Sequence, residues 1–352
     1  MRYYEDVASH RKRSVLPPEL QHSLVRLRDS IRAGRVDPHE LTTLVSDLSL
    51  LPSEAYLQAA REIIDLGGLH QWHEPTRFFR LIGRSQPDYE LLLKTPNLEY
   101  LYLFHGNGYL REQSLAEIDG PIESAFYFNS IAYRLNDWAE PVRKAAQACA
   151  ARVFPQTSTR IIAEAAFVLL ERMRHWQRRD KEAEILEETF ARADVIEQLS
   201  DLIETAITGS PSRVLLNTLR QKNMDAYLLK LSRLALQPSV RALALKSLIQ
   251  GYAAWPDGFR REWTDKSMGQ FRRVPTFHRR ELDCSEPVEA LLAQGAVDKA
   301  AIVRKVAADG LVQHRRSLND LDVLLDLFVQ DKSRAVKERA NFILNEKEQG
   351  LL

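Results

Sequence analysis

The chain has 352 residues, of which 45% are hydrophobic, a share that allows a sizeable core and excludes wholesale disorder. Lysine and arginine together number 49 against 48 acidic residues, so the formal net charge is +1. A chain so close to neutral cannot bind nucleic acid through its overall charge, and any such role needs a local basic patch. The two cysteines, Cys149 and Cys284, exclude a disulfide framework and a four-cysteine zinc site.

Residues 1–16 form a polar N-terminal tail with a basic cluster at Arg11, Lys12 and Arg13. The tail lacks the apolar core of a signal peptide. No window of the chain approaches the roughly 18 uninterrupted apolar residues that a membrane-spanning helix needs. We therefore expect a cytoplasmic protein that makes no contact with a membrane.

From residue 17 onward the sequence is typical of helices separated by proline, glycine or polar turns. Clear predicted helices span Pro121–Leu135, Thr159–Met173, Asp194–Ile207, Asp225–Leu236, Leu318–Gln330 and, in a charged final stretch, Lys332–Glu348. Four glycines are candidates for turns or helix ends: Gly106, Gly120, Gly209 and Gly310. Roughly 18 helical segments, or about eight to nine helix pairs, are predicted in all.

One short pattern recurs along the chain: a polar turn, an apolar residue, a basic residue and a run of small residues. Its basic positions are Arg111, Arg143, Arg241, Arg304 and Lys337, separated by 32, 98, 63 and 33 residues. These gaps correspond to one, three, two and one units of about 32 residues. An aspartate occupies the turn in three copies, at Asp137, Asp298 and Asp331. The basic residue lies off the apolar stripe of its helix, where it can reach carbonyls or acids of an adjacent repeat.

These stretches resemble HEAT repeats, whose second helix commonly begins with an aspartate-containing turn followed by valine, arginine and small residues. The resemblance extends from about Asn107 to Ile343, although the units between Pro155 and Leu236 lack the motif. It implies an all-α fold, a right-handed α-solenoid of about eight to nine HEAT-like helix pairs with a concave inner surface. Such solenoids serve many different partners.

The resemblance also suggests a domain organisation. HEAT-like repeats are expected over 17–254, an inter-repeat insertion over 255–284, and C-terminal HEAT-like repeats with a cap over 285–352. The insertion is too long for a turn between helices. From Trp255 to Glu281 it holds three Arg-Arg pairs and Lys266, seven basic residues against four acidic ones.

The insertion is the candidate binding segment. Basic and aromatic side chains together suit the capture of an acidic peptide, or phosphate pairing combined with base stacking. The alternative is an extended segment whose aromatic side chains pack on the helices while its arginines are solvated. The candidate partner-binding residues are Trp255, Arg260, Arg261, Trp263, Lys266, Phe271, Arg272, Arg273, His278, Arg279 and Arg280.

The sequence gives little indication of a catalytic site. The sequence contains no HExxH, P-loop, GxSxG or CxxC motif. His70 and His73, followed by Glu74, lack an identifiable third metal ligand. Cys149 falls on an apolar stripe and is expected in the core. We therefore expect no catalytic residue, no metal and no cofactor.

The favoured interpretation is a non-enzymatic binding or scaffold protein whose partner is another protein. The alternative is DNA or RNA binding. Some alkylpurine DNA glycosylases are built from HEAT-like repeats and use aromatic residues, an acid and arginines in a concave cleft. Asp137, Trp138 and Arg143 supply these residue types, but Asp137 stands where the repeat places its helix cap.

Overall fold

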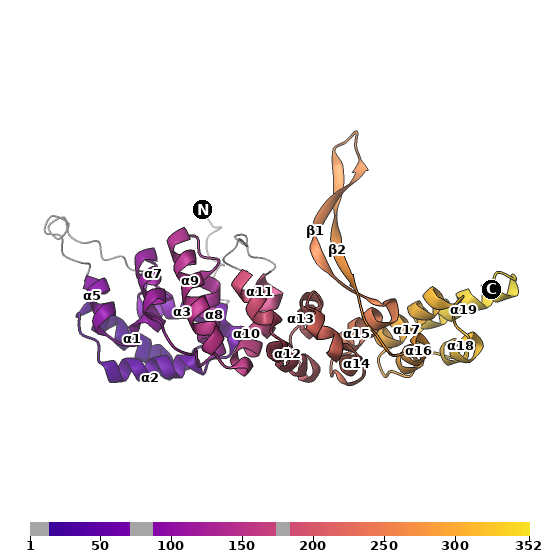
Figure 1. Ribbon diagram of the computed structural model, residues 1–352. Coiled ribbons are helices and arrows are strands. Elements are labelled where there is room, and N and C mark those ends of the chain that lie inside the picture. The colour runs from indigo at the N-terminus through magenta and orange to yellow at the C-terminus, as the bar shows by residue number, and fades with distance from the viewer. Residues whose placement is uncertain (1–13, 71–86, 174–183) are drawn as a thin grey trace, which may run out of the picture. The chain divides into compact units, whose positions relative to one another are not determined.

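The structure is a computed structural model that describes residues 14–70, 87–173 and 184–352. These residues form 18 α-helices, short 3₁₀ turns and one two-stranded antiparallel sheet (Figure 1). The expectation of a mainly helical chain is confirmed. The segment predicted as an insertion between the helices contains both strands. The predicted N-terminal tail lies outside the described residues as far as residue 13.

The chain divides into two compact units. The first holds α1 (Pro18–Arg32), α2 (Pro38–Ser49), α3 (Tyr56–Gly67), α5 (Pro87–Lys94), α6 (Leu98–Tyr102), α7 (Gly108–Glu117), α8 (Ala125–Arg134) and α9 (Glu140–Val153). Its core is rich in aromatic residues, and the stacked rings of Phe128 and Phe154 lie 4.0 Å apart between centroids. Cys149 of α9 is fully buried in this core, as expected, and burial raises its pKa to about 12. Helices α10 (Thr159–Arg172) and α11 (Glu184–Ala191) contribute residues to both units.

The second unit continues with helices in two layers. It holds α12 (Ala193–Thr205), α13 (Pro211–Thr218), α14 (Asp225–Leu234), α15 (Pro238–Gln250), α16 (Val288–Ala296), α17 (Ala301–His314), α18 (Leu321–Val329) and α19 (Arg334–Glu348). Helices α13, α15, α17 and α19 contact one another in that order, while α12 contacts α14 and α16 contacts α18. Small residues allow neighbouring helices of this unit to pack closely. A Cβ added at Gly295 of α16 would lie only 2.6 Å from the Cβ of Ala307 in α17.

Each helix predicted from the sequence is present, with ends shifted by a few residues. The predicted segments correspond to α8, α10, α12, α14, α18 and α19. The interpretation of Gly310 as a turn or helix-end residue is wrong. Gly310 lies inside α17, where an added Cβ would stand 2.7 Å from a methyl carbon of Ile249 in α15. It therefore serves close helix packing.

Candidate functional site

The predicted insertion is a β-hairpin of β1 (Tyr252–Asp265) and β2 (Gln270–Glu281). Figure 1 shows the two strands running away from the neighbouring helices α13 and α15. The chain reverses where the Asp265 carboxylate accepts the backbone N–H groups of Ser267 and Met268, at 2.8 and 3.1 Å. Gly269 completes the turn with a φ of 67°, a conformation that favours glycine.

Arg280 fixes the base of the hairpin to the helices. Its guanidinium binds both carboxylate oxygens of Asp225 at 2.5 and 2.6 Å and donates to the carbonyls of Leu219 and Gln221, each at 3.1 Å. Next to it, Ala253 of β1 is fully buried. The sequence grouped Arg280 with the partner-binding residues, whereas the structure gives its guanidinium an internal role.

The register of the strands divides the side chains of the ribbon between two faces. Trp263 pairs with Phe271, Arg261 with Arg273, and Phe259 with Pro275, and paired residues share a face. Because side chains alternate along β2, Phe277 and Arg279 share this face too. We call it the arginine–aromatic face: Phe259, Arg261, Trp263, Phe271, Arg273, Pro275, Phe277 and Arg279. Its aromatic rings are open to solvent, with exposures of 69% for Phe259, 51% for Phe277, 48% for Trp263 and 40% for Phe271.

The opposite face neutralises its own charges, and we call it the paired face: Trp255, Arg260, Glu262, Arg272, Val274, His278 and Arg280. On it, Arg272 binds Glu262 at 2.6 Å, and this hydrogen bond lowers the pKa of the Glu262 carboxyl. His278 lies 2.7 Å from Asp257 of the bulged part of β1. The charge of this face is therefore largely satisfied within the protein.

On the arginine–aromatic face the pair Arg261 and Arg273 has no such compensation, and the carboxylate of Glu281 lies at the base of the ribbon, opposite Tyr252. Arg261 and Arg273 stand directly opposite each other, and within the described parts of the chain neither forms an ion pair with a carboxylate. Arg261 lies over the Phe271 ring, 4.8 Å from its centroid, and Arg279 lies over the Tyr252 ring at 4.7 Å. These cation–π contacts hold two guanidinium groups in place without neutralising them.

The hairpin thus brings the candidate residues into one ribbon but divides them between its two faces. Five lie on the arginine–aromatic face and five on the paired face, while Lys266 lies in the turn. Sequence reasoning missed Phe259 and Phe277, which are the most exposed aromatic residues of the ribbon. Their spacing of two from Arg261 and Arg279 is the signal that could have found them, once the segment is treated as strand.

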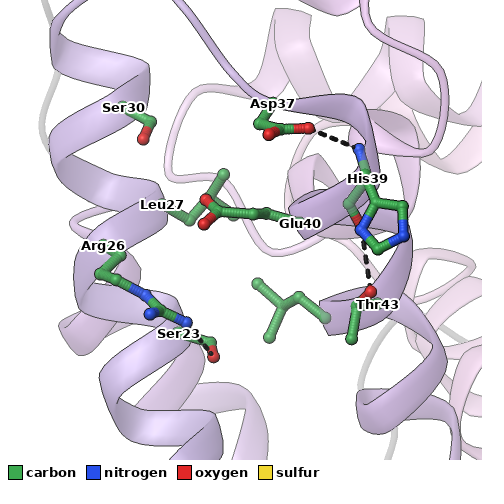
Figure 2. A pocket seen from close by; sticks show the side chains of 9 residues that line it. Ser23, Arg26, Leu27, Ser30, Asp37, His39, Glu40 and Thr43 are labelled. Carbon is green, nitrogen blue, oxygen red and sulfur yellow. Dashed lines mark hydrogen bonds between the residues drawn. The ribbon is translucent and has the colours of Figure 1, made fainter.

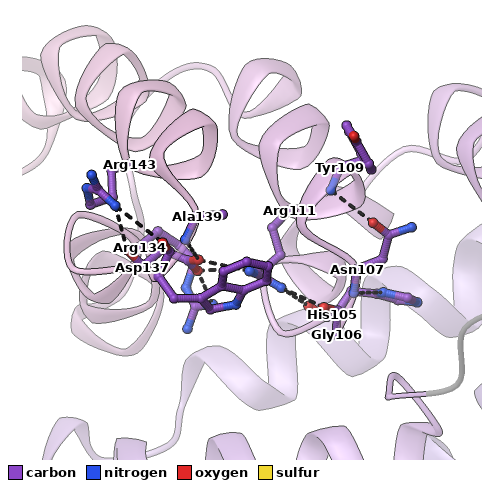
Figure 3. A network of polar contacts seen from close by, with 10 residues as sticks. His105, Gly106, Asn107, Tyr109, Arg111, Arg134, Asp137, Ala139 and Arg143 are labelled. Atoms are coloured by element: carbon purple, nitrogen blue, oxygen red, sulfur yellow. Dashed lines mark hydrogen bonds and ion pairs between the residues drawn. The ribbon is translucent and has the colours of Figure 1, made fainter.

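The repeat motif builds a second arrangement, drawn in Figure 3 for the first unit. The guanidinium of Arg111 binds Asp137 through Nε and Nη2 at 3.0 and 2.9 Å. Its Nη1 donates to the carbonyls of His105 and Gly106 at 2.7 and 3.0 Å. One buried arginine therefore ties the turn before its own helix to the aspartate of the next turn.

The same geometry recurs in the second unit. Arg241 binds Asp298 at 2.8 and 2.9 Å and donates to the carbonyls of Ala235 and Leu236. Arg304 binds Asp331 at 2.6 and 3.1 Å and donates to the carbonyls of Asp298 and Lys299. We call these contacts the arginine–aspartate rungs.

Arg143 and Lys337 are two further members of the motif. Arg143 donates its Nη1 to the carbonyls of Asp137 at 3.1 Å and Trp138 at 3.5 Å, so it repeats the first half of the geometry. Lys337 is exposed, and its charge helps to lower the pKa of Asp331, an effect smaller than that of Arg304. The motif residues thus belong to the internal framework of the helices.

Asp137 is poorly placed for the base of a glycosylase. Its carboxylate is 2% exposed and accepts hydrogen bonds from Arg111, Arg134 at 2.9 Å and the backbone N–H of Ala139 at 3.1 Å. Both carboxylate oxygens are therefore occupied by donors within the protein. Trp138, in contrast, is 69% exposed beside it. The arrangement holds the turn before α9 in place.

A shallow cavity of about 120 Å³ lies between α1 and α2 and is lined by Ser23, Arg26, Leu27, Ser30, Asp37, His39, Glu40, Thr43 and Leu44 (Figure 2). Several of its polar side chains are engaged locally. Asp37 accepts the backbone N–H of His39 at 2.8 Å, which caps α2, and Arg26 donates to Ser23 at 3.3 Å. The cavity therefore lacks a set of convergent polar groups that would orient a ligand.

Metal sites and membrane-spanning helices are both absent from the part of the chain that the structure describes. Within 14–70, 87–173 and 184–352, no group of three or more His, Cys, Asp or Glu side chains could hold a metal ion. Of the histidine pair considered as ligands, His73 lies outside the described residues, as does Glu74. None of the helices in these ranges combines the length and apolar character needed to cross a membrane.

Comparison of the chain with models of known protein families and with curated proteins gave no match.

Proposed function

We propose that this chain is a non-enzymatic binding or scaffold protein, built as a right-handed HEAT-like solenoid, that contacts a protein partner through its hairpin. The rungs support the HEAT-like interpretation, because the same arginine geometry recurs at three copies of the motif, those of Arg111, Arg241 and Arg304. The two-layer contacts of α12 to α19 agree with stacked helix pairs. A concave surface of the stack would add to the contact.

The arginine–aromatic face is the observation on which the proposal rests. Exposed aromatic rings and arginines dominate the energy of protein interfaces, because they bury large areas and form charge-assisted hydrogen bonds. Here they share one side of an arm whose base is fixed by Arg280 and Asp225. A fixed arm loses little conformational entropy on binding, which favours affinity.

The test is affinity capture from native lysate with the tagged full-length protein, with and without nuclease. The matched variant replaces residues 257–276 by Asn-Gly, which joins the partners Pro256 and Phe277 by a two-residue turn and keeps Arg280. We expect a discrete protein that survives nuclease treatment and is captured by the wild type but not by this variant. Equal capture by both proteins would contradict the proposal.

Nucleic acid is the second candidate partner, because the free arginines and the exposed rings would also suit phosphates and bases. The dependence of binding on salt concentration distinguishes a nucleic-acid partner from a protein partner. Phosphate-driven binding falls linearly with the logarithm of salt concentration, with a slope set by the number of phosphates engaged. Recovery of nucleic acid, with the protein partners lost after nuclease, would favour this second candidate.

A further inference from the structure

Two side chains of like charge face each other across the strands of the hairpin. Arg261 of β1 and Arg273 of β2 are direct cross-strand partners. Like charges placed directly opposite each other destabilise a strand pair, so the free hairpin carries an electrostatic cost at this point. The nearest acid along the chain, Glu262, points to the other face and is bound to Arg272 at 2.6 Å. An anion placed between Arg261 and Arg273 would remove this cost.

The arginine pair lies between two rows of apolar side chains. On the side of the turn, Trp263 and Phe271 pack edge to face, with ring centroids 5.6 Å apart. On the side of the base, Phe259 faces Pro275. A charged group that binds between the arginines is therefore flanked by apolar surface on both sides. Exclusion of water by these neighbours strengthens a charge-assisted hydrogen bond.

We infer that the arginine–aromatic face binds an extended segment of a protein partner that carries an aspartate or glutamate between apolar residues. This inference rests on the proposed function and specifies its ligand. The carboxylate lies between Arg261 and Arg273, and the flanking apolar side chains contact the Trp263–Phe271 row and the Phe259–Pro275 row. The chemistry recognised is thus acidic at the centre and apolar on either side.

A peptide carboxylate fits this face better than a nucleic-acid strand. Base stacking needs an open ring face, but one face of Phe271 is covered by the Arg261 guanidinium at 4.8 Å, and Trp263 packs against its edge. The rows next to Arg261 and Arg273 are apolar on both sides, so a single carboxylate finds both guanidinium groups, whereas the neighbouring phosphates of a continuous backbone would meet no arginine in those rows.

The test compares two charge reversals on adjacent residues of β1. Arg261→Glu places a carboxylate opposite Arg273, so it converts the like pair into an opposite pair while it removes the contact of Arg261 with the Phe271 ring. Arg260→Glu makes the same change of net charge on the paired face and is the matched control. Thermal unfolding of both full-length variants verifies that neither change disrupts the fold.

The probes are peptides selected by the full-length protein from a displayed library of random sequences as long as β2, which has 12 residues. A labelled single-stranded oligothymidylate is the second probe. Binding is measured by fluorescence anisotropy at physiological salt. We expect enriched peptides with an acid between apolar residues, and a loss of affinity of about tenfold or more for Arg261→Glu. Arg260→Glu should change the affinity by less than about threefold.

Three results would overturn the inference: no enriched peptide, equal losses for the two variants, or tighter binding of the oligothymidylate with the same dependence on Arg261. The capture experiment distinguishes failure of this inference from failure of the proposed function. If capture of the protein partner requires the hairpin but survives Arg261→Glu, the arginine pair is not the contact and the proposed function stands. If capture survives removal of the hairpin, the proposed function itself fails.

Discussion

Arg241 of α15 and Asp298, in the turn before α17, lie 57 residues apart in the sequence and are joined by two hydrogen bonds of 2.8 and 2.9 Å. Their side chains are 13% and 14% exposed. The remaining Nη1 group of Arg241 binds the carbonyl of Ala235 at 2.7 Å. One side chain therefore links the turn of its own repeat to the turn of the next, across the hairpin that separates them in sequence.

Removal of the acid from this rung should destabilise the second unit. In Asp298→Ala, the Arg241 guanidinium stays largely buried without its partner, and we expect the free energy of unfolding to fall by about 2–4 kcal/mol. The measurement is urea denaturation followed by circular dichroism. Lys230→Ala is the control, because Lys230 pairs with Asp201 and Glu204 but is 42% exposed and should contribute less than about 1 kcal/mol. Equal effects would mean that burial does not strengthen the rung.

Stability should fall in acid because of the rungs. The hydrogen bond from Arg304 lowers the pKa of Asp331 below its ordinary value of 3.8, and the backbone N–H of Ser333 adds to the effect. Since the folded pKa is the lower one, the contribution to stability is complete above the ordinary value and is lost as pH falls through the folded pKa. Urea midpoints measured from neutral pH downward should therefore be flat above about pH 5 and drop below about pH 4.

The variant Asp331→Asn identifies the rung as a source of that acid dependence. It should be less stable than the wild type at neutral pH and should lose less stability on acidification, because the asparagine does not titrate. An unchanged slope in Asp331→Asn would show that other groups dominate the acid response.

Loss of the anchor at the base should loosen the hairpin. Arg280→Ala removes two bonds to Asp225 and two to backbone carbonyls, so we expect the strands to separate from α13 and α14 more often. Chymotrypsin, which cuts after aromatic residues, should then cleave at Phe259 or Phe277 faster than in the wild type. The neighbouring Arg279→Ala is the control, since Arg279 contacts Tyr252 of the hairpin itself and should leave the cleavage rate nearly unchanged.

Close helix packing should make two glycines intolerant of a methyl group. A Cβ at Gly310 would lie 2.7 Å from Ile249 and 2.9 Å from Leu292, so Gly310→Ala should lower the free energy of unfolding by about 1–3 kcal/mol. Gly295→Ala should do the same for the same reason. At Gly108 the nearest atoms are 3.8 Å away, and Gly108→Ala should stay within about 0.5 kcal/mol of the wild type in thermal unfolding.

The helices could be predicted from the sequence because their signals are local. A polar turn followed by a stripe of small residues is visible within one repeat, and it also marks Arg241, Arg304 and Asp331 as members of a series. Which acid each arginine binds was not visible, because the rung partners lie 26, 57 and 27 residues away. The role of Gly310 depends on a neighbouring helix and likewise has no local signal.

The strands escaped prediction for a different reason. Each of the doublets Arg260-Arg261, Arg272-Arg273 and Arg279-Arg280 places one arginine on each face, so polarity does not alternate along the segment. A ribbon exposed on both faces lacks the period-two pattern by which a half-buried strand is recognised. The basic and aromatic composition identified the segment as a candidate site, but only the register shows that its charges are satisfied on one face and unsatisfied on the other.

The rungs also give the repeat series a polarity. In every complete rung the arginine precedes the aspartate in the chain, so a repeat offers a donor group on its C-terminal side and an acceptor on its N-terminal side. Two repeats joined in reversed orientation would bring guanidinium against guanidinium, or carboxylate against carboxylate. Head-to-tail order is therefore encoded in the turns themselves, and a repeat transplanted from one position to another must keep that orientation to be held by its neighbours.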